Sequence, residues 1–271
     1  MPLLWPTCWR RNLNYKLLKE EYDPQPVCKE CYATVLPGHR YCHNCGVYLG
    51  HEAVSISIYN NADLRNIFIF YFTYLAFCLF VKNSSWFNSY DEMFWMELLL
   101  AGMTTWFAWL NRREIKPLFR FNNFKWYLLA GVILMAVACS IIISLSVREL
   151  NVTFFKNEVS YYGAYRIYMF PIAIMIYSIA LMPALFEEIA FRGVMYNYCA
   201  AFLDERLVVV ITAFLFAIMH LSLISLAWLI PFGFFIGSLR RKYNTLWYGI
   251  FFHFTFNLTA CVIDLYRQGV L

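Results

Sequence analysis

The chain carries a series of apolar runs of about 20 residues, and this repetition limits its fold more than any other feature. Hydrophobic residues make up 61% of the 271 positions and charged residues only 14%, against about 25% charged in an average soluble domain. Such a composition is too apolar for the surface of one soluble core. It also excludes a disordered chain, which needs low hydrophobicity. The sequence therefore predicts a polytopic membrane protein.

Seven runs are long enough, or nearly so, to cross the hydrocarbon core of a bilayer as helices. They cover residues 64–82, 93–110, 126–147, 167–202, 207–224, 225–239 and 245–265. The run 167–202 is too long for one straight span, so that Pro183 kinks it, part of it projects from the bilayer, or it crosses twice and makes eight spans. The predicted fold class is all-α, a bundle of about seven transmembrane helices over residues 64–271 that follows a polar N-terminal region, 1–63.

The positions of Lys and Arg predict an orientation. If the N-terminus is cytoplasmic, 17 of the 22 Lys and Arg residues lie on the cytoplasmic side. The remaining five are Lys82, Arg148, Lys156, Arg166 and Arg267. Since basic loops favour the cytoplasm, we expect a cell-membrane protein with its N-terminus inside and, after an odd number of spans, its C-terminus outside. Basic residues confined to short loops also argue against nucleic-acid binding.

The polar N-terminal region contains two C-x2-C pairs, made by Cys28, Cys31, Cys42 and Cys45. Two such pairs facing each other supply the four thiolates that Zn²⁺ prefers. The spacing predicts a structural zinc ribbon over about residues 26–48, whose folding depends largely on the metal. Disulfides are the alternative, but they need an oxidising compartment, and the predicted orientation places this region in the cytoplasm.

The second pair, within Tyr41-Cys-His-Asn-Cys-Gly46, resembles the short zinc-ribbon heads of many bacterial membrane proteins. The first pair departs from that pattern, because Tyr32 stands where a glycine is usual. By association, the resemblance implies a cytoplasmic protein partner for the ribbon.

Charged residues inside the apolar runs are the strongest functional signal. Between positions 167 and 203 these are Glu187, Glu188 and Arg192, and such groups persist in a bilayer when they are paired or line a wet cavity. On a helix Glu188 and Arg192 share a face and form an ion pair. Glu187 points about 100° away and is left without a local partner, as a general base would be. Taken alone, the three residues are equally compatible with a structural pair.

Two later runs carry His220, one turn after Phe216, and His253, one turn before Asn257. Counting along the helices from the predicted loops brings these side chains and Glu187 to one depth near the middle of the membrane. Gly233 and Gly237 form a small-xxx-small face that lets helices pack closely. Two histidines, a carboxylate and an amide at one depth are enough to hold and activate a water molecule.

These three motifs, Glu187-Glu-x3-Arg192, Phe216-x3-His220 and His253-x3-Asn257, resemble the signature of the CAAX-protease and bacteriocin-processing (CPBP, or Abi) intramembrane proteases, over about residues 167–265. The resemblance implies an endopeptidase acting on membrane-associated, prenylated or leader peptides. It assigns the general base to Glu187, with His220 helping to hold the water. His253 and Asn257 would stabilise the oxyanion, and Arg192 would hold Glu188.

Three questions stay open at the level of sequence. Two histidines and a carboxylate could bind a catalytic zinc ion, but the same set could act without a metal. The family also includes members that act as scaffolds, in bacteriocin immunity or in control of a sensor kinase. A transporter is a third reading, ranked last because the runs show no evident internal repeat.

Overall fold

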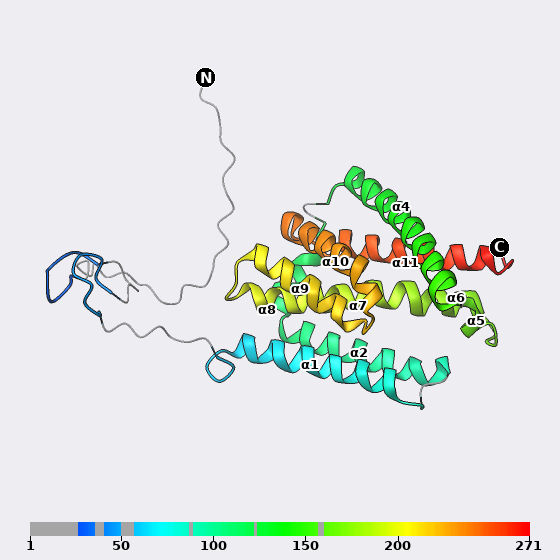
Figure 1. Cartoon of the computed structure of the whole chain (residues 1–271), viewed down its shortest axis with the longest axis horizontal. Coiled ribbons are helices and arrows are strands. Elements are labelled where there is room, and N and C mark those ends of the chain that lie inside the picture. Colours follow the sequence, from blue (N-terminus) through cyan, green and yellow to red (C-terminus); the bar gives the residue numbers. More distant parts are fainter. Residues whose placement is uncertain (1–26, 36–40, 50–56, 87–88, 122–123, 157–159) are drawn as a thin grey trace, which may run out of the picture. The chain divides into compact units, whose positions relative to one another are not determined.

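The computed structural model describes residues 27–35, 41–49, 57–86, 89–121, 124–156 and 160–271. The chain divides into two units, Met1–Ile56 and Ser57–Leu271 (Figure 1). The first contains the two C-x2-C pairs, and the second contains the helices. The described residues form helices and two isolated antiparallel bridges, Val27 with Thr34 and Tyr41 with Tyr48, but no extended strand.

The long helices follow the predicted apolar runs. They are α1 (Ala62–Asn83), α2 (Tyr90–Leu110), α4 (Trp126–Leu150), α9 (Glu205–Met219), α10 (Leu223–Tyr243) and α11 (Trp247–Arg267), together with one composite helix, Pro171–Ala200. Short segments connect them: α3 (Arg112–Ile115), η1 (Lys116–Phe119), η2 (Asn151–Phe155) and α5 (Tyr162–Tyr165). The prediction of an all-α membrane bundle is confirmed.

Six of these helices in the described chain are long and apolar enough to cross a membrane. The exception is α9, in the predicted run 207–224. This helix has 15 residues and therefore spans about 22 Å. It ends early because Leu221 adopts a positive φ of 52° and Ser222 caps α10 by accepting a hydrogen bond from the backbone N–H of Ser225.

The composite helix Pro171–Ala200 is continuous, so the run 167–202 does not cross twice. Its parts are α6 (Pro171–Ile176), η3 (Tyr177–Leu181), α7 (Met182–Glu188), η4 (Ile189–Met195) and α8 (Tyr196–Ala200). Both η3 and η4 are π-helical. Pro183 lacks an N–H and would clash with the carbonyl of Ile179 in a regular α-helix. The wider π-turn at η3 accommodates the proline at this point.

Close packing joins the helices around this composite helix. Helix α11 packs against α4 and α7, and α10 packs against α9. At the second contact the predicted small-residue face is present, because a Cβ on Gly233 would lie 3.0 Å from the Cα of Ala213. A Cβ on Gly237 would lie 3.1 Å from a Val209 methyl carbon. The two glycines therefore let α10 approach the backbone of α9.

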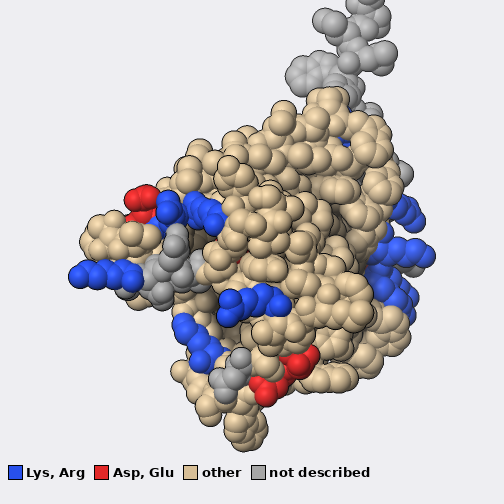
Figure 2. Space-filling view, turned by 90° about the vertical axis from the view of Figure 1, so that its right-hand side faces the viewer, with Lys and Arg blue, Asp and Glu red and all other residues tan. Residues whose placement is uncertain are grey.

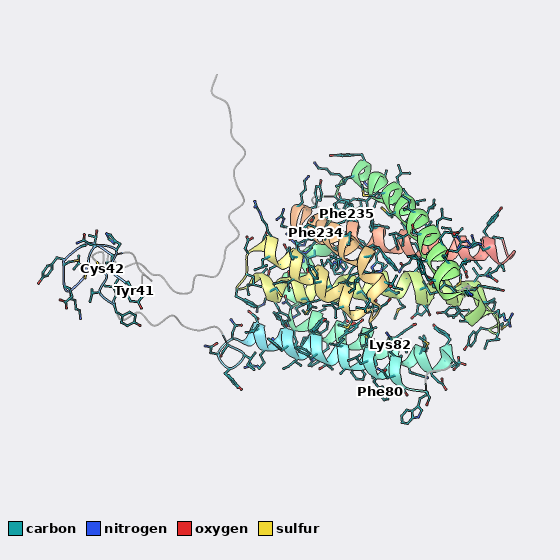
Figure 3. All side chains as sticks on the ribbon, in the orientation of Figure 1. Tyr41, Cys42, Phe80, Lys82, Phe234 and Phe235 are labelled. Carbon is teal, nitrogen blue, oxygen red and sulfur yellow. The ribbon has the colours of Figure 1, made fainter. Side chains whose placement is uncertain are left out.

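The outer surface of the bundle is apolar. Leu134 and Ile142 on α4 expose 71% and 64% of their surface. Figure 3 labels Phe234, which is also exposed, and its neighbour Phe235, which packs against the core. An apolar exterior of this extent is unfavourable in water and suits the hydrocarbon of a bilayer.

Candidate active site in the helical unit

A buried ion pair forms the base of the site. Glu188, at the end of α7, and Arg192, in the π-helical η4, are 0% and 1% exposed, and Oε1 of Glu188 accepts a hydrogen bond of 3.0 Å from Nη1 of Arg192. Nη2 of Arg192 donates to the backbone carbonyl of Gly233, and the guanidinium lies 4.4 Å from the Phe216 ring centre. The ion pair predicted from the i, i+4 spacing is therefore present.

His253 lies between the two adjacent glutamates. Its Nδ1 is 3.0 Å from Oε1 of Glu188, and its Nε2 is 3.9 Å from Oε2 of Glu187. The short contact with a carboxylate places the proton of the imidazole on Nδ1. The other ring nitrogen, Nε2, faces Glu187. The imidazole is almost fully buried, and its ring centre lies 5.0 Å from that of Phe232 and 6.0 Å from that of Phe216.

Glu187 is held differently from its neighbour. Its side chain is 24% exposed, yet the Oε2 atom is buried and has no hydrogen-bond partner among the described residues. Since buried carboxylate oxygens in proteins are nearly always hydrogen-bonded, this atom is an acceptor suited to a water molecule or a substrate. Oε2 of Glu188 also lacks a partner, but that side chain is fully buried and its Oε1 contacts Arg192 and His253. Glu187, which is partly exposed, therefore has the environment of a reactive carboxylate, and Glu188 that of a structural one.

His220 caps the C-terminus of α9. Its Nδ1 is 3.0 Å from the carbonyl oxygen of Phe216, one turn earlier. A carbonyl only accepts, so Nδ1 carries the proton and Nε2 is the acceptor of the neutral ring. The Phe216-x3-His220 spacing thus orients the imidazole through the backbone of the same helix.

A hydrogen bond made possible by Pro183 joins Asn257 to the composite helix. The missing N–H of the proline leaves the carbonyl of Ile179 without its helical donor, and Nδ2 of Asn257 donates to that oxygen at 2.8 Å. One amide hydrogen is thereby engaged in positioning α11 against η3. The amide of Asn257 therefore has a structural role, in addition to the oxyanion role that the resemblance implies.

A cavity of about 550 Å³ joins these side chains. Four of the six predicted residues line it: Glu187, His220, His253 and Asn257. The other two, Glu188 and Arg192, lie behind His253 and do not line it. The packing therefore brings together residues from three separate motifs. The sequence predicted this convergence only from the depth of each residue along its helix.

Sequence reasoning did not identify Arg240, which supports the site from behind. The residue is 3% exposed, and its Nε donates to the backbone carbonyl of Arg192 at 3.1 Å. It also donates to the side-chain oxygens of Asn197 and Asn244. Arg240 thus fixes the π-helical η4, whose own carbonyls are not all satisfied by regular i, i+4 bonds. In the sequence Arg240 belongs to the basic turn Arg240-Arg241-Lys242, which was interpreted only as a signal of membrane orientation.

Gly249 is a second residue that the sequence did not reveal. A Cβ at this position would lie 2.8 Å from Oε2 of Glu188 and 2.6 Å from Cγ2 of Ile236. Any larger residue must therefore displace the carboxylate that holds His253. A glycine one turn before the histidine of the third motif is the signal that could have indicated this close approach.

The candidate metal centre lies in the N-terminal unit. The Sγ atoms of Cys28, Cys31, Cys42 and Cys45 all lie within 4.8 Å of one another, and among the described residues no other group of three or more His, Cys, Asp or Glu ligands meets this criterion. Two of the S–S distances are 3.6 and 3.5 Å, near the roughly 3.8 Å expected for a tetrahedron with 2.3 Å Zn–S bonds. These cysteines are free thiols and could bind a metal ion.

The two knuckles have matching backbones. The N–H of Cys28 donates to Ala33 and its carbonyl accepts from Tyr32, while Cys42 makes the same bonds with Val47 and Gly46. Tyr32 and Gly46 both adopt a positive φ, of 57° and 74°. Tyr32 therefore occupies the conformation that a glycine would adopt without strain. Bonds to the sulfur, first of all from the backbone N–H of Ala33, lower the pKa of Cys31 to about 6.

Comparison with known proteins supports the resemblance. Residues 169–259 match the family model described as type II CAAX prenyl endopeptidase Rce1-like. The matched segment begins just before α6 and includes all six predicted site residues. No curated protein and no solved structure gives a significant match. The resemblance to CPBP-type proteases, expected from three short motifs, is thus confirmed by an independent family model.

Proposed function

We propose that this protein is an intramembrane endopeptidase that hydrolyses a peptide bond of a membrane-associated substrate, with prenylated and leader peptides as the classes the family suggests. The observation that carries this proposal is the convergence of Glu187, His220, His253 and Asn257 on one cavity. The match of this region to a family of endopeptidases supports the same reaction type.

In the proposed reaction Glu187 takes a proton from water, because its Oε2 is a buried acceptor without a protein partner and its side chain lines the cavity. Nε2 of His220 accepts a second hydrogen bond from the same water, while Nδ1 stays bonded to Phe216. The activated water attacks the carbonyl carbon of the peptide bond. Glu187 then gives its proton to the leaving amine, so that water is divided between the two new termini.

His253, with a proton on each ring nitrogen, and Asn257, through its second amide hydrogen, are the proposed donors to the oxyanion that forms during the attack. Glu188 orients the imidazole through Nδ1, and Arg192 balances the charge of Glu188. These two residues act by positioning, since they do not line the cavity. Two side chains for the water and two for the oxyanion complete a site for acyl transfer to water.

For the rest of the chain we keep the assignments made from sequence as proposals. These are a structural Zn²⁺ on the four cysteines, a ribbon within residues 1–63, a helical domain from 64 to 271 with its core at about 167–265, and a cytoplasmic N-terminus with the C-terminus outside. A cytoplasmic protein that binds the ribbon belongs with them.

The experiment compares protein and peptide termini in cells that carry the wild type, the Glu187→Gln variant or the Glu114→Gln variant at equal abundance. Glu114 is exposed on α3, outside the site, and controls for the loss of one carboxylate. New termini present with the wild type and Glu114→Gln but absent with Glu187→Gln would establish a protease. Identical termini in all three strains, with a phenotype that Glu187→Gln still rescues, would favour the scaffold alternative.

A further inference from the structure

We propose that the substrate peptide reaches the site through a groove lined by α4, α10 and α11, from the membrane face at which α4 and α11 end. This inference rests on the proposed function and adds the route and the extended conformation of the substrate.

The positions of the residues that line the cavity point to this face. On α4 they occupy the last turns, from Ile143 to Arg148, and on α11 they continue to Arg267. On α10 they lie in the first half, from Ser225 to Phe232, and α10 runs opposite to α11. Each of these three helices therefore contributes the part that lies nearest one end of the bundle, so that the cavity opens there.

The opposite half of the bundle is closed. Arg192, Tyr196 and Tyr248 are among its largest fully buried side chains. Arg240 lies across η4 with its guanidinium on the Tyr196 ring, 4.7 Å from the ring centre. A peptide cannot pass this layer without breaking the bonds that hold Glu188. Access from the side of the basic turn Arg240–Lys242 is thus blocked.

The groove has the length of a short extended peptide. From His253 to Arg267 it follows 14 residues of α11, or about 21 Å. An extended chain advances about 3.5 Å per residue, so about six residues fill the groove. Its outer end is polar, lined by Arg148, Asn151, Asp264, Arg267 and Gln268. Figure 2 looks onto this end and shows several Lys and Arg side chains on it.

These features fit a hydrophilic, extended segment of a substrate better than a lipid chain, because the groove becomes more polar toward its mouth. Asp264 accepts hydrogen bonds from Ser160 and the backbone N–H of Tyr162, which leaves Arg267 as a cation for an acidic residue of the substrate. With the N-terminus in the cytoplasm, the mouth lies on the outer face of the membrane.

Thiol labelling tests the route without any substrate. Ala260 lines the middle of the groove, and Val262 is exposed on another side of α11. Cysteine variants at both positions are treated in sealed cells and in inverted vesicles with the impermeant reagent sulfonatoethyl methanethiosulfonate. The Arg267→Cys variant serves as the reference for the membrane face at which α11 ends, and Arg241→Cys for the opposite face. Labelled peptides are quantified by mass spectrometry against the wild type.

We expect Ala260→Cys to be labelled in the same preparation as Arg267→Cys, and Val262→Cys to be labelled at least tenfold less. Ile263→Cys, which also lines the groove, provides a second position if the first variant does not accumulate. Labelling of these two variants from the Arg241→Cys face, or no labelling while Arg267→Cys reacts, would overturn the proposed route.

A second arm tests substrate passage. Ala260→Trp fills the groove and should abolish the termini that depend on Glu187, whereas Val262→Trp should leave them unchanged. If both tryptophan variants still produced the termini that depend on Glu187, the proposed route through the groove would be refuted, but the proposed protease activity would not. If the wild type produces no termini that depend on Glu187, the proposed function fails, and the labelling still decides whether the groove opens at this face.

Discussion

The candidate metal centre and the candidate intramembrane site are built in opposite ways. Four cysteines within 18 residues, Cys28 to Cys45, form the first, and each knuckle is closed by backbone bonds to residues four or five positions away. The second requires side chains from α7, η4, α9 and α11, whose positions in sequence extend from Glu187 to Asn257. A local site fails alone when a ligand is lost, whereas a site built by helix packing fails together with the packing.

Arg192→Ala should have the largest effect on stability. It tests most sharply whether the intramembrane site fails together with the packing of its helices. It removes the guanidinium from Glu188, which is 0% exposed and keeps only its contact with His253, and breaking a buried pair in this way typically costs about 3–5 kcal/mol. We expect strongly reduced accumulation in the membrane and a lower unfolding temperature in detergent.

The matched control is Arg241→Ala, the exposed neighbour of Arg240, which should accumulate normally. Normal accumulation of Arg192→Ala as well would contradict the structural role given to the pair.

Cys28→Ser should affect the other region alone. We expect the loss of about one Zn²⁺ per chain, since tetrahedral sites of this kind need all four ligands. The unfolding temperature of the helical unit should stay unchanged. Cys139→Ser, in α4, should keep its metal. A metal content equal to the wild type in Cys28→Ser would refute the ribbon assignment.

Gly249→Ala should damage the intramembrane site with a moderate effect on folding. The new methyl group would meet Oε2 of Glu188 at 2.8 Å, and such overpacking costs about 1–3 kcal/mol. We expect Glu187-dependent cleavage to fall more than tenfold while the protein still accumulates. In Gly102→Ala, nothing lies within 4 Å of the added Cβ, and cleavage should be retained. Equal activities would show that Glu188 tolerates displacement.

Tyr32→Gly should have the smallest effect, and it should be stabilising. A tyrosine with φ of 57° is strained by about 1 kcal/mol relative to glycine. Competition with a chelator should show about fivefold tighter metal binding by the full-length protein, while Gly46→Ala should bind more weakly. Weaker binding in Tyr32→Gly would indicate that the tyrosine ring makes contacts that outweigh its strained backbone.

The sequence predicted local features well. The C-x2-C spacing, the Glu188–Arg192 pair and the small-residue face of Gly233 and Gly237 all depend on neighbours along one segment, and the structure contains each of them. The end of α9 was harder to predict, because an apolar run does not reveal that Leu221 leaves the helical conformation.

The residues that support the candidate active site could not be predicted from one sequence. Arg240 acts on a carbonyl 48 residues away, and Gly249 matters because Glu188 packs against it from another helix. The π-helical turn before Pro183 likewise exposes a carbonyl that only the packed bundle brings to Asn257. Each of these contacts depends on how the helices assemble.

The most direct test of the central claim uses the purified full-length protein in lipid nanodiscs with a peptide identified from cells. Cleavage is run in ¹⁸O-labelled water for the wild type and for Glu187→Gln. We expect one ¹⁸O atom in the new carboxyl terminus and a rate at least about 100-fold lower in the variant, the range for loss of a general base. Cleavage by Glu187→Gln at the wild-type rate would contradict the assignment of the general base to this carboxylate.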